Sequence, residues 1–304
     1  MKRYVIISIV ILTLMIPLVG ASSLLKTDKV MLMSSPKNDF THAVLAEYAT
    51  ATTCPYCVIA SSQLYSIYNS GDLDFYYVSL VYDKGNLNVR SRLTELGVSS
   101  IPDVYFDGGY RHLLGAQTDE QPYRNAMTQC GERDVPDIEI TEVNVQWKGS
   151  GTLKITVNVQ NNEPEDYNGH LRVYIVEKES RWNDNGGNPY HFGVLDIPID
   201  RALSVVAQGQ PMPLGTTYTF QKTWIGALYG FSDLTKDNIL VIASLFDGDS
   251  NYAVQTAAAA PTVGGSSSQQ SSQSQGQSIP QQSQRILVNQ QINQIVKLVK
   301  LMNR

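Results

Sequence analysis

The sequence predicts a mixed α/β domain followed by an all-β sandwich. Between residues 42 and 130, patterns typical of strands and helices alternate in the order β-α-β-α-β-β-α, as in a mixed sheet with helices on its faces. From 135 to 259 only short strand patterns remain. The composition then changes, because sixteen of the nineteen residues from 266 to 284 are Ser or Gln. We therefore expect a disordered linker at 260–284 and an amphipathic helix at 285–304.

Composition limits the function classes. The chain has 304 residues, of which 42% are hydrophobic and 17% charged, so most of it can bury a core. The net charge of −5 argues against a general nucleic-acid-binding protein. Three cysteines are too few for a disulfide scaffold.

The first residues predict export. Lys2 and Arg3 precede an uncharged stretch that runs from residue 4 to 25, and Val19-Gly20-Ala21 offers small residues at a cleavage site. We expect residues 1–21 to be a signal peptide or an N-terminal anchor, followed by a tether at 22–40. Either form places the rest outside the cytoplasm, in the periplasm, at the cell surface or in the medium, where a disulfide can persist.

The α/β domain is expected at 41–134. Its predicted elements are a strand at 43–48, a helix at 58–68, a strand at 74–82, a helix at 87–96 closed by Gly97, a hairpin of strands 103–106 and 110–114 across Asp107-Gly108-Gly109, and a helix at 119–130.

The sandwich domain is expected at 135–259. Apolar residues alternate strictly from 153 to 159 and again from 171 to 175, which indicates strands with one buried face. Residues 239–246 form a continuous apolar strand that turns at 247–251 into a further strand. The turn resembles the start of a calcium loop, but Ala258 stands where the final acidic ligand is needed, so a hairpin turn explains it better.

The last twenty residues predict a basic amphipathic helix. Apolar residues recur there at alternating spacings of four and three, and four Lys or Arg residues give the segment a charge of +4. Such a helix can pair with another copy, lie on an anionic membrane or dock on the acidic body, and two heptads are also short enough to stay disordered.

Cys54-Pro55-Tyr56-Cys57 is the motif that carries chemistry. It lies between the first predicted strand and the first predicted helix. A cysteine at a helix N-terminus faces unpaired N–H groups and the positive end of the helix dipole, so its thiolate is stabilised. The second thiol, one turn further on, can attack a mixed disulfide and release the partner.

A second feature stands 45 residues after Cys57. Ile101-Pro102 precedes the hairpin strand, at a position where an X-Pro bond can be cis. Together with the Cys-x-x-Cys motif it resembles the thioredoxin superfamily over residues 42–131. The resemblance implies that Cys54 is the attacking nucleophile, that Cys57 is the resolving thiol, and that the backbone at Ile101-Pro102 binds the substrate chain.

The sequence departs from that family at several positions. Pro55-Tyr56 is similar to the dipeptide of glutaredoxins, and the intervening residues tune the redox poise and form part of the substrate surface. Thioredoxins keep a buried acid six residues before the first cysteine, where this chain has Tyr48. Glu47 could serve as proton acceptor only if the strand register shifted by one residue.

Other interpretations of these residues stay open. The Cys54–Cys57 pair could be a structural disulfide. A zinc site would need four ligands, and His42 and Cys130 are the only recruits in this domain, so we expect no metal. Cys130 is expected to be a buried apolar residue. Trp182, beside an Asn/Gly-rich loop at 183–188, and Tyr190-His191-Phe192 could form a recognition surface.

The second half has a fainter resemblance of its own. The segments 171–177, 190–195 and 240–256 resemble, in order and texture, a family of exported proteins related to a twenty-eight-kilodalton outer-membrane protein. In that family a thioredoxin-like domain precedes a β-sandwich.

These observations predict an exported thiol–disulfide oxidoreductase that acts on thiols and disulfides of exported proteins, with an unidentified redox partner and no cofactor. The alternative is a surface binding or adhesion module in which the disulfide only staples a thioredoxin-like scaffold. The two differ in the accessibility and pKa of the Cys54 thiol.

Overall fold

The computed structural model describes residues 40–206 and 208–263. The expected signal peptide and tether, the Ser/Gln-rich linker and the C-terminal helix lie outside the described residues. No helix of the described residues is long and apolar enough to cross a membrane.

The first half contains the alternating elements that the sequence predicts. They are β1 (Val44–Thr50), α2 (Cys57–Ser70), β2 (Phe75–Val81), α3 (Leu87–Glu95), β3 (Asp103–Phe106), β4 (Arg111–Leu114) and α4 (Gln121–Gly131). Local signals set several ends. The side chain of Asn86 accepts a hydrogen bond from the amide of Val89 and caps α3, and Gly71, in the left-handed conformation, ends α2.

The second half is built almost entirely of strands. They are β5 (Ile138–Trp147), β6 (Thr152–Asn161), β7 (Gly169–Asn183), β8 (Pro189–Ala202), β9 (Thr217–Ile225), β10 (Ile239–Asp247), β11 (Ala253–Ala259) and β12 (Thr262–Val263). The segment after Asp247 is a hairpin turn, in which the Asp247 carboxylate accepts hydrogen bonds from the amides of Asp249 and Ser250.

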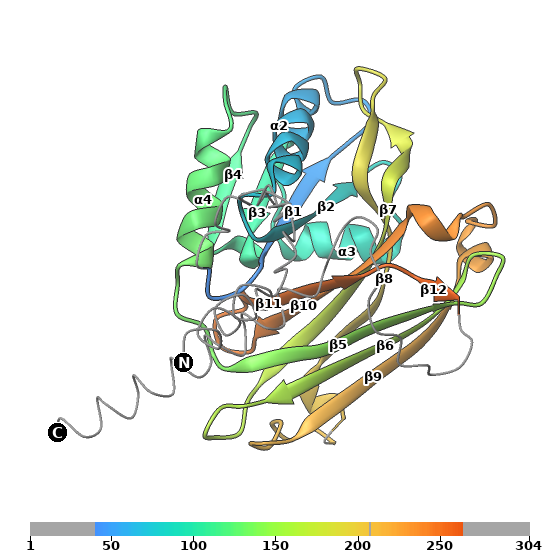
Figure 1. Cartoon of the computed structure of the whole chain (residues 1–304). Helices are drawn as coiled ribbons and strands as arrows, with labels where there is room; N and C mark the ends of the chain where they lie inside the picture. The colour runs from blue at the N-terminus through green and yellow to red at the C-terminus, as the bar shows by residue number, and fades with distance from the viewer. Residues whose placement is uncertain (1–39, 207, 264–304) are drawn as a thin grey trace, which may run out of the picture. The chain divides into compact units, whose positions relative to one another are not determined.

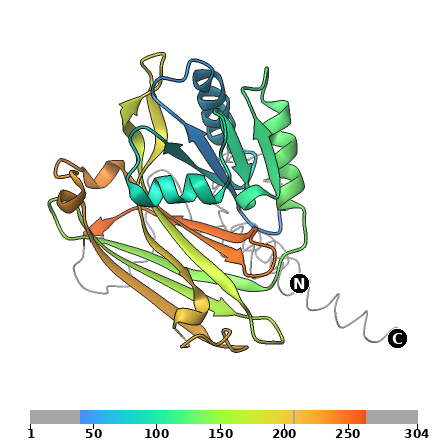
Figure 2. The ribbon, with the colours of Figure 1, turned by 180° about the vertical axis from the view of Figure 1, so that it is seen from behind.

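One sheet extends through both halves. Its strand order is β11-β10-β7-β8-β2-β1-β3-β4. The junction is a parallel pair of β2 and β8, with Ser79 opposite Gly193, and the Ser79 hydroxyl donates to the carbonyl of His191 at 2.8 Å. Figures 1 and 2 show this sheet passing from the α/β part, where helices cover it, into the β-rich part. The two halves are thus joined by backbone pairing.

The second sheet, β12-β5-β6-β9, covers the β-rich part of the first. Leu153, Ile155, Val157 and Val159, the alternating residues of β6, are all fully buried between the two sheets. Strand β7 is buried on both faces. Its residues Leu171, Val173 and Ile175 belong to this core, whereas Tyr174 and Val176 belong to the core of the α/β part.

Strand β1 separates two environments in the α/β part. Its side chains alternate between the two faces of the sheet. On one face the Tyr48 hydroxyl reaches the first residue of α2. On the other face the Glu47 carboxylate accepts hydrogen bonds from Arg92 of α3 at 2.7 and 2.6 Å and from the Tyr174 hydroxyl of β7 at 2.6 Å. Glu47 therefore binds the β-rich part to the α/β part.

Candidate functional site at the Cys54–Cys57 disulfide

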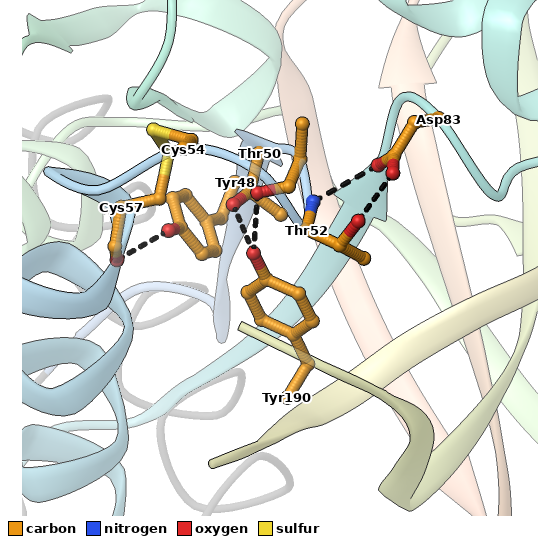
Figure 3. Close-up of a disulfide and its surroundings, with 8 residues drawn as sticks. Tyr48, Thr50, Thr52, Cys54, Cys57, Asp83 and Tyr190 are labelled. Carbon is orange, nitrogen blue, oxygen red and sulfur yellow. Dashed lines mark hydrogen bonds between the residues drawn. A yellow bond between two sulfur atoms is a disulfide. The ribbon is translucent and has the colours of Figure 1, made fainter. Parts of the chain in front are cut away.

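Cys54 and Cys57 form a disulfide, with an S–S distance of 2.07 Å and a Cα–Cα distance of 5.4 Å. The bond closes the loop between the end of β1 and the start of α2 (Figure 3). The intervening Pro55 and Tyr56 are exposed, Tyr56 by 68%. Cys54 is 7% exposed, whereas Cys57 is fully buried. An approaching thiol would therefore meet Cys54 first.

The start of α2 provides a favourable environment for a thiolate. Cys57 is the first residue of the helix, and the disulfide holds the Cys54 sulfur against it. Tyr56 makes no side-chain cap, and the first turn contains no acidic residue. The positive end of the helix dipole is therefore uncompensated by these groups and can stabilise an anionic Cys54 sulfur after reduction.

Tyr48 supports the buried cysteine. Its hydroxyl donates to the carbonyl oxygen of Cys57 at 2.7 Å. The side chain is fully buried, and burial raises the pKa of Tyr48 well above its ordinary value. Tyr48, six residues before Cys54, is therefore a neutral hydrogen-bond donor that holds Cys57, the first residue of α2.

Glu47 is not placed to act as proton acceptor for the cysteines, because this would require a register shift of one residue in β1. Strand β1 pairs with β2 and β3 without a register shift, so Glu47 lies on the opposite face from Tyr48. Burial raises the pKa of Glu47, but Arg92, Arg172 and Tyr174 more than offset this and hold it below its ordinary value. The carboxylate is an ion-pair partner on the α3 face.

The loop before Cys54 is held by two acceptors. The amide of Thr52 donates to Asp83 Oδ1 at 2.9 Å, and the Thr52 hydroxyl donates to Asp83 Oδ2. Burial raises the pKa of Asp83, but these hydrogen bonds outweigh it and lower the pKa. The amide of Cys54 donates to the carbonyl of Ala51 at 3.1 Å.

A tyrosine from the β-rich part completes the surroundings. The Tyr190 hydroxyl of β8 lies 2.9 Å from Thr50 Oγ1 and donates to the Ala51 carbonyl at 2.9 Å (Figure 3). The sequence does not predict this contact. Its only signal is the aromatic cluster Tyr190-His191-Phe192, which we expected at a recognition surface. That expectation is wrong for Tyr190 and Phe192, which are 0% and 5% exposed and belong to the core.

Ile101-Pro102 lies beside the end of β1. Strand β3 pairs antiparallel with β1, and Asp103 stands opposite Ala49, so Pro102 falls next to the strand end from which the Cys54 loop departs. The Ile101-Pro102 bond is cis. The amide of Gly115 donates a hydrogen bond to the carbonyl of Pro102 at 2.8 Å. Within residues 40–206 and 208–263, nothing pairs with the backbone N–H donor and C=O acceptor of Ile101.

His42 and Cys130 are not near this loop. His42 precedes β1, at the opposite end of the strand from Cys54, and its ring Nε2–H donates to the Asp107 carboxylate at 2.8 Å. Cys130 of α4 is a free, fully buried thiol, and burial together with the nearby Asp107 raises its pKa well above its ordinary value. Within residues 40–206 and 208–263, no group of His, Cys, Asp and Glu is arranged to hold a metal ion.

The chain is similar to known proteins in fold. No protein-family model and no curated protein matches the sequence. Among solved structures, HBP35 of Porphyromonas gingivalis matches with a TM-score of 0.54 at 13% identity, over 78% of this chain and 81% of that protein. The chain thus shares its overall fold with HBP35.

Two further solved structures match more weakly. A protein of Agrobacterium tumefaciens has a TM-score of 0.47 at 13% identity, over 76% of this chain and 99% of that one. A domain of the outer membrane lipoprotein Omp28 from Porphyromonas gingivalis has a TM-score of 0.26 at 14% identity, over 43% of this chain and 92% of that domain.

Proposed function

We propose that the chain is an extracytoplasmic thiol–disulfide oxidoreductase with a thioredoxin-like α/β part, in which Cys54 exchanges with cysteines of exported proteins. The observation that carries the proposal is the Cys54–Cys57 disulfide at the N-terminus of α2, with Cys54 on the more exposed side. The reaction requires a Cys54 sulfur that can be reached from outside, where it is attacked in the disulfide form or attacks as a thiolate after reduction, and a second thiol beside it.

Oxidation of a substrate by the Cys54–Cys57 disulfide takes two steps. A substrate thiolate attacks the Cys54 sulfur, the Cys54–Cys57 bond breaks, and a mixed disulfide forms while Cys57 leaves as a thiolate. A second substrate thiolate then attacks the substrate sulfur of the mixed disulfide, and Cys54 leaves as a thiolate. The substrate gains one disulfide and the chain gains two electrons and two protons. The reverse sequence reduces a substrate disulfide.

The substrate would lie extended across the cysteine loop and Ile101. The backbone N–H and C=O groups of Ile101, which bond to no other residue that the structure describes, can pair with a polypeptide as an added strand. The exposed ring of Tyr56 offers an apolar contact next to the disulfide. Recognition of this kind depends on backbone and on one cysteine, so it fits many unfolded or extended substrates.

A surface binding module with a structural disulfide is the second candidate. It is favoured by the small exposure of Cys54, 7%, because a stapling disulfide needs no access. In that case the bond would stabilise the loop, and its removal would lower stability without loss of any exchange activity.

Exchange with a cysteine-containing peptide separates the two. We expect the full chain to oxidise or reduce such a peptide, and both Cys54→Ser and Cys57→Ser to abolish turnover. Cys57→Ser should in addition accumulate a mixed disulfide through Cys54, because the resolving thiol is missing. Cys130→Ala is the matched control and should retain full activity. Turnover that survives Cys54→Ser would contradict the proposal.

A further inference from the structure

The carbonyl of Ala51 is one of the points at which the cysteine loop is held, besides the Asp83 carboxylate that binds Thr52. It accepts the amide of Cys54 at 3.1 Å from within the loop and the hydroxyl of Tyr190 at 2.9 Å from β8. Ala51 is 5% exposed and Tyr190 is fully buried, so water does not readily replace the tyrosine. Figure 3 shows Tyr190 pointing from its strand toward the segment that leads to Cys54.

The strand that carries Tyr190 is itself fixed against the α/β part. The neighbouring His191 ring stacks on Tyr65 of α2, with ring centroids 3.3 Å apart. The turn between β7 and β8 lies against the start of α2. A Cβ placed on Gly186 in this turn would be only 3.4 Å from the side chain of Val58, the residue after Cys57. The edge of the Tyr190 ring also meets the Tyr48 ring, at a centroid distance of 6.5 Å. The hydroxyl therefore has little freedom to leave Ala51.

We propose that Tyr190 is a positioning residue for the redox pair, which holds Cys54 close to Cys57 after the disulfide has been reduced. The proposal rests on the redox function proposed above and assigns a part in it to the β-rich half. The hydroxyl is bound to a backbone group of the loop, so the contact can form without the S–S bond. It is weaker in the dithiol, because the hydrogen bond must then order the loop by itself. It supplies the constraint that the covalent bond no longer supplies in the dithiol.

The consequence is a shift in the dithiol–disulfide equilibrium. In the reaction with glutathione, one glutathione disulfide oxidises the dithiol, the Cys54–Cys57 bond forms, and two glutathione thiols are released. A loop that already holds the two sulfurs together loses less conformational entropy when this bond forms. A hydrogen bond that stabilised both redox forms equally would leave the equilibrium constant unchanged, because stability and redox affinity are linked.

Tyr190→Phe tests the proposal, since it removes the hydroxyl and keeps the ring. We expect the equilibrium constant for disulfide formation against glutathione to fall by up to about tenfold. The contacts of the hydroxyl with Ala51 and Thr50 are stronger in the disulfide form, and their difference between the two forms is at most that of one ordinary hydrogen bond. Tyr167→Phe is the matched control. Tyr167 also belongs to a buried core, the one between the two sheets, and its hydroxyl donates to Asp247 at 3.1 Å. That variant should lose stability equally in both redox forms and leave the constant unchanged.

An unchanged constant in Tyr190→Phe, or an equal fall in Tyr167→Phe, would overturn the proposal. If Tyr190→Phe does not fold, hydrogen exchange of the buried Tyr190 hydroxyl in the unsubstituted chain decides. We expect that hydroxyl proton to stay protected after reduction, though less than in the disulfide form, and a complete loss of protection would overturn the proposal. The constant is measured on the chain's own cysteines, so a shifted constant without peptide turnover would refute the proposed enzyme while leaving the role of Tyr190 intact.

Discussion

Replacing Glu47 by glutamine should destabilise both halves of the chain together. The carboxylate is fully buried and accepts two hydrogen bonds from Arg92 and one from Tyr174. Arg92 is itself 4% exposed, so the variant leaves a buried guanidinium without its main counter-charge. Removing one partner of a buried pair costs about 3–5 kcal/mol, and we expect the lower end because glutamine keeps some of the hydrogen bonds.

The assay is denaturant unfolding at neutral pH, followed at several probes, with Glu132→Gln as control. Glu132 is exposed at the end of α4, so its substitution should change the free energy of unfolding by no more than about 0.5 kcal/mol. Because Glu47 joins β1 to α3 and β7, the loss should appear in a single transition. A loss below about 1 kcal/mol, or a second transition confined to one half, would refute this account of the junction.

The pH dependence provides a further check. The pKa of Glu47 is held below its ordinary value of 4.5 in the folded chain. Its contribution to stability is therefore complete above pH 4.5 and is lost as the pH falls through the lower folded value. The stability gap between the unsubstituted chain and Glu47→Gln should accordingly narrow below pH 4.5. A gap that widens on acidification would mean that the folded pKa is raised.

Two further outcomes concern the cysteines. Tyr48→Phe removes the donor to the Cys57 carbonyl and should lower the free energy of unfolding by about 1–2 kcal/mol, measured by denaturant titration of the disulfide form; a neutral effect would mean that the buried carbonyl finds another partner. Cys130, fully buried with a raised pKa, should resist alkylation in the folded reduced chain while Cys54 reacts, as mass spectrometry of the modified peptides would reveal; equal labelling of the two thiols would contradict the burial of Cys130.

Local patterns are sufficient to predict the elements of the α/β part. Gly97 after α3, which is in the left-handed conformation, the turn at Asp107-Gly108-Gly109 and the apolar spacing of α2 all act over a few residues, and the corresponding elements form where expected. The burial of Cys130 and the hairpin turn after Asp247 follow from the same kind of signal.

Long-range pairing explains what the sequence does not predict. The β2–β8 pair joins residues 79 and 193, and no local pattern specifies which strand edges meet. In β7 the apolar residues at 171, 173 and 175 predict one buried face. Tyr174 and Val176 also become buried, because the strand lies between two cores. The contact of Tyr190 with the cysteine loop depends on that same junction.

The reactivity of the Cys54 thiol decides whether Cys54–Cys57 is an active redox pair or a structural disulfide. We would equilibrate the full chain with glutathione to obtain the reduction potential of the Cys54–Cys57 pair, and follow alkylation of Cys54 in the reduced chain across pH. For an active redox pair we expect a potential above about −300 mV and a Cys54 thiolate that titrates below about pH 7.5. A potential below about −300 mV with no thiolate at neutral pH would contradict it and make the disulfide a structural staple.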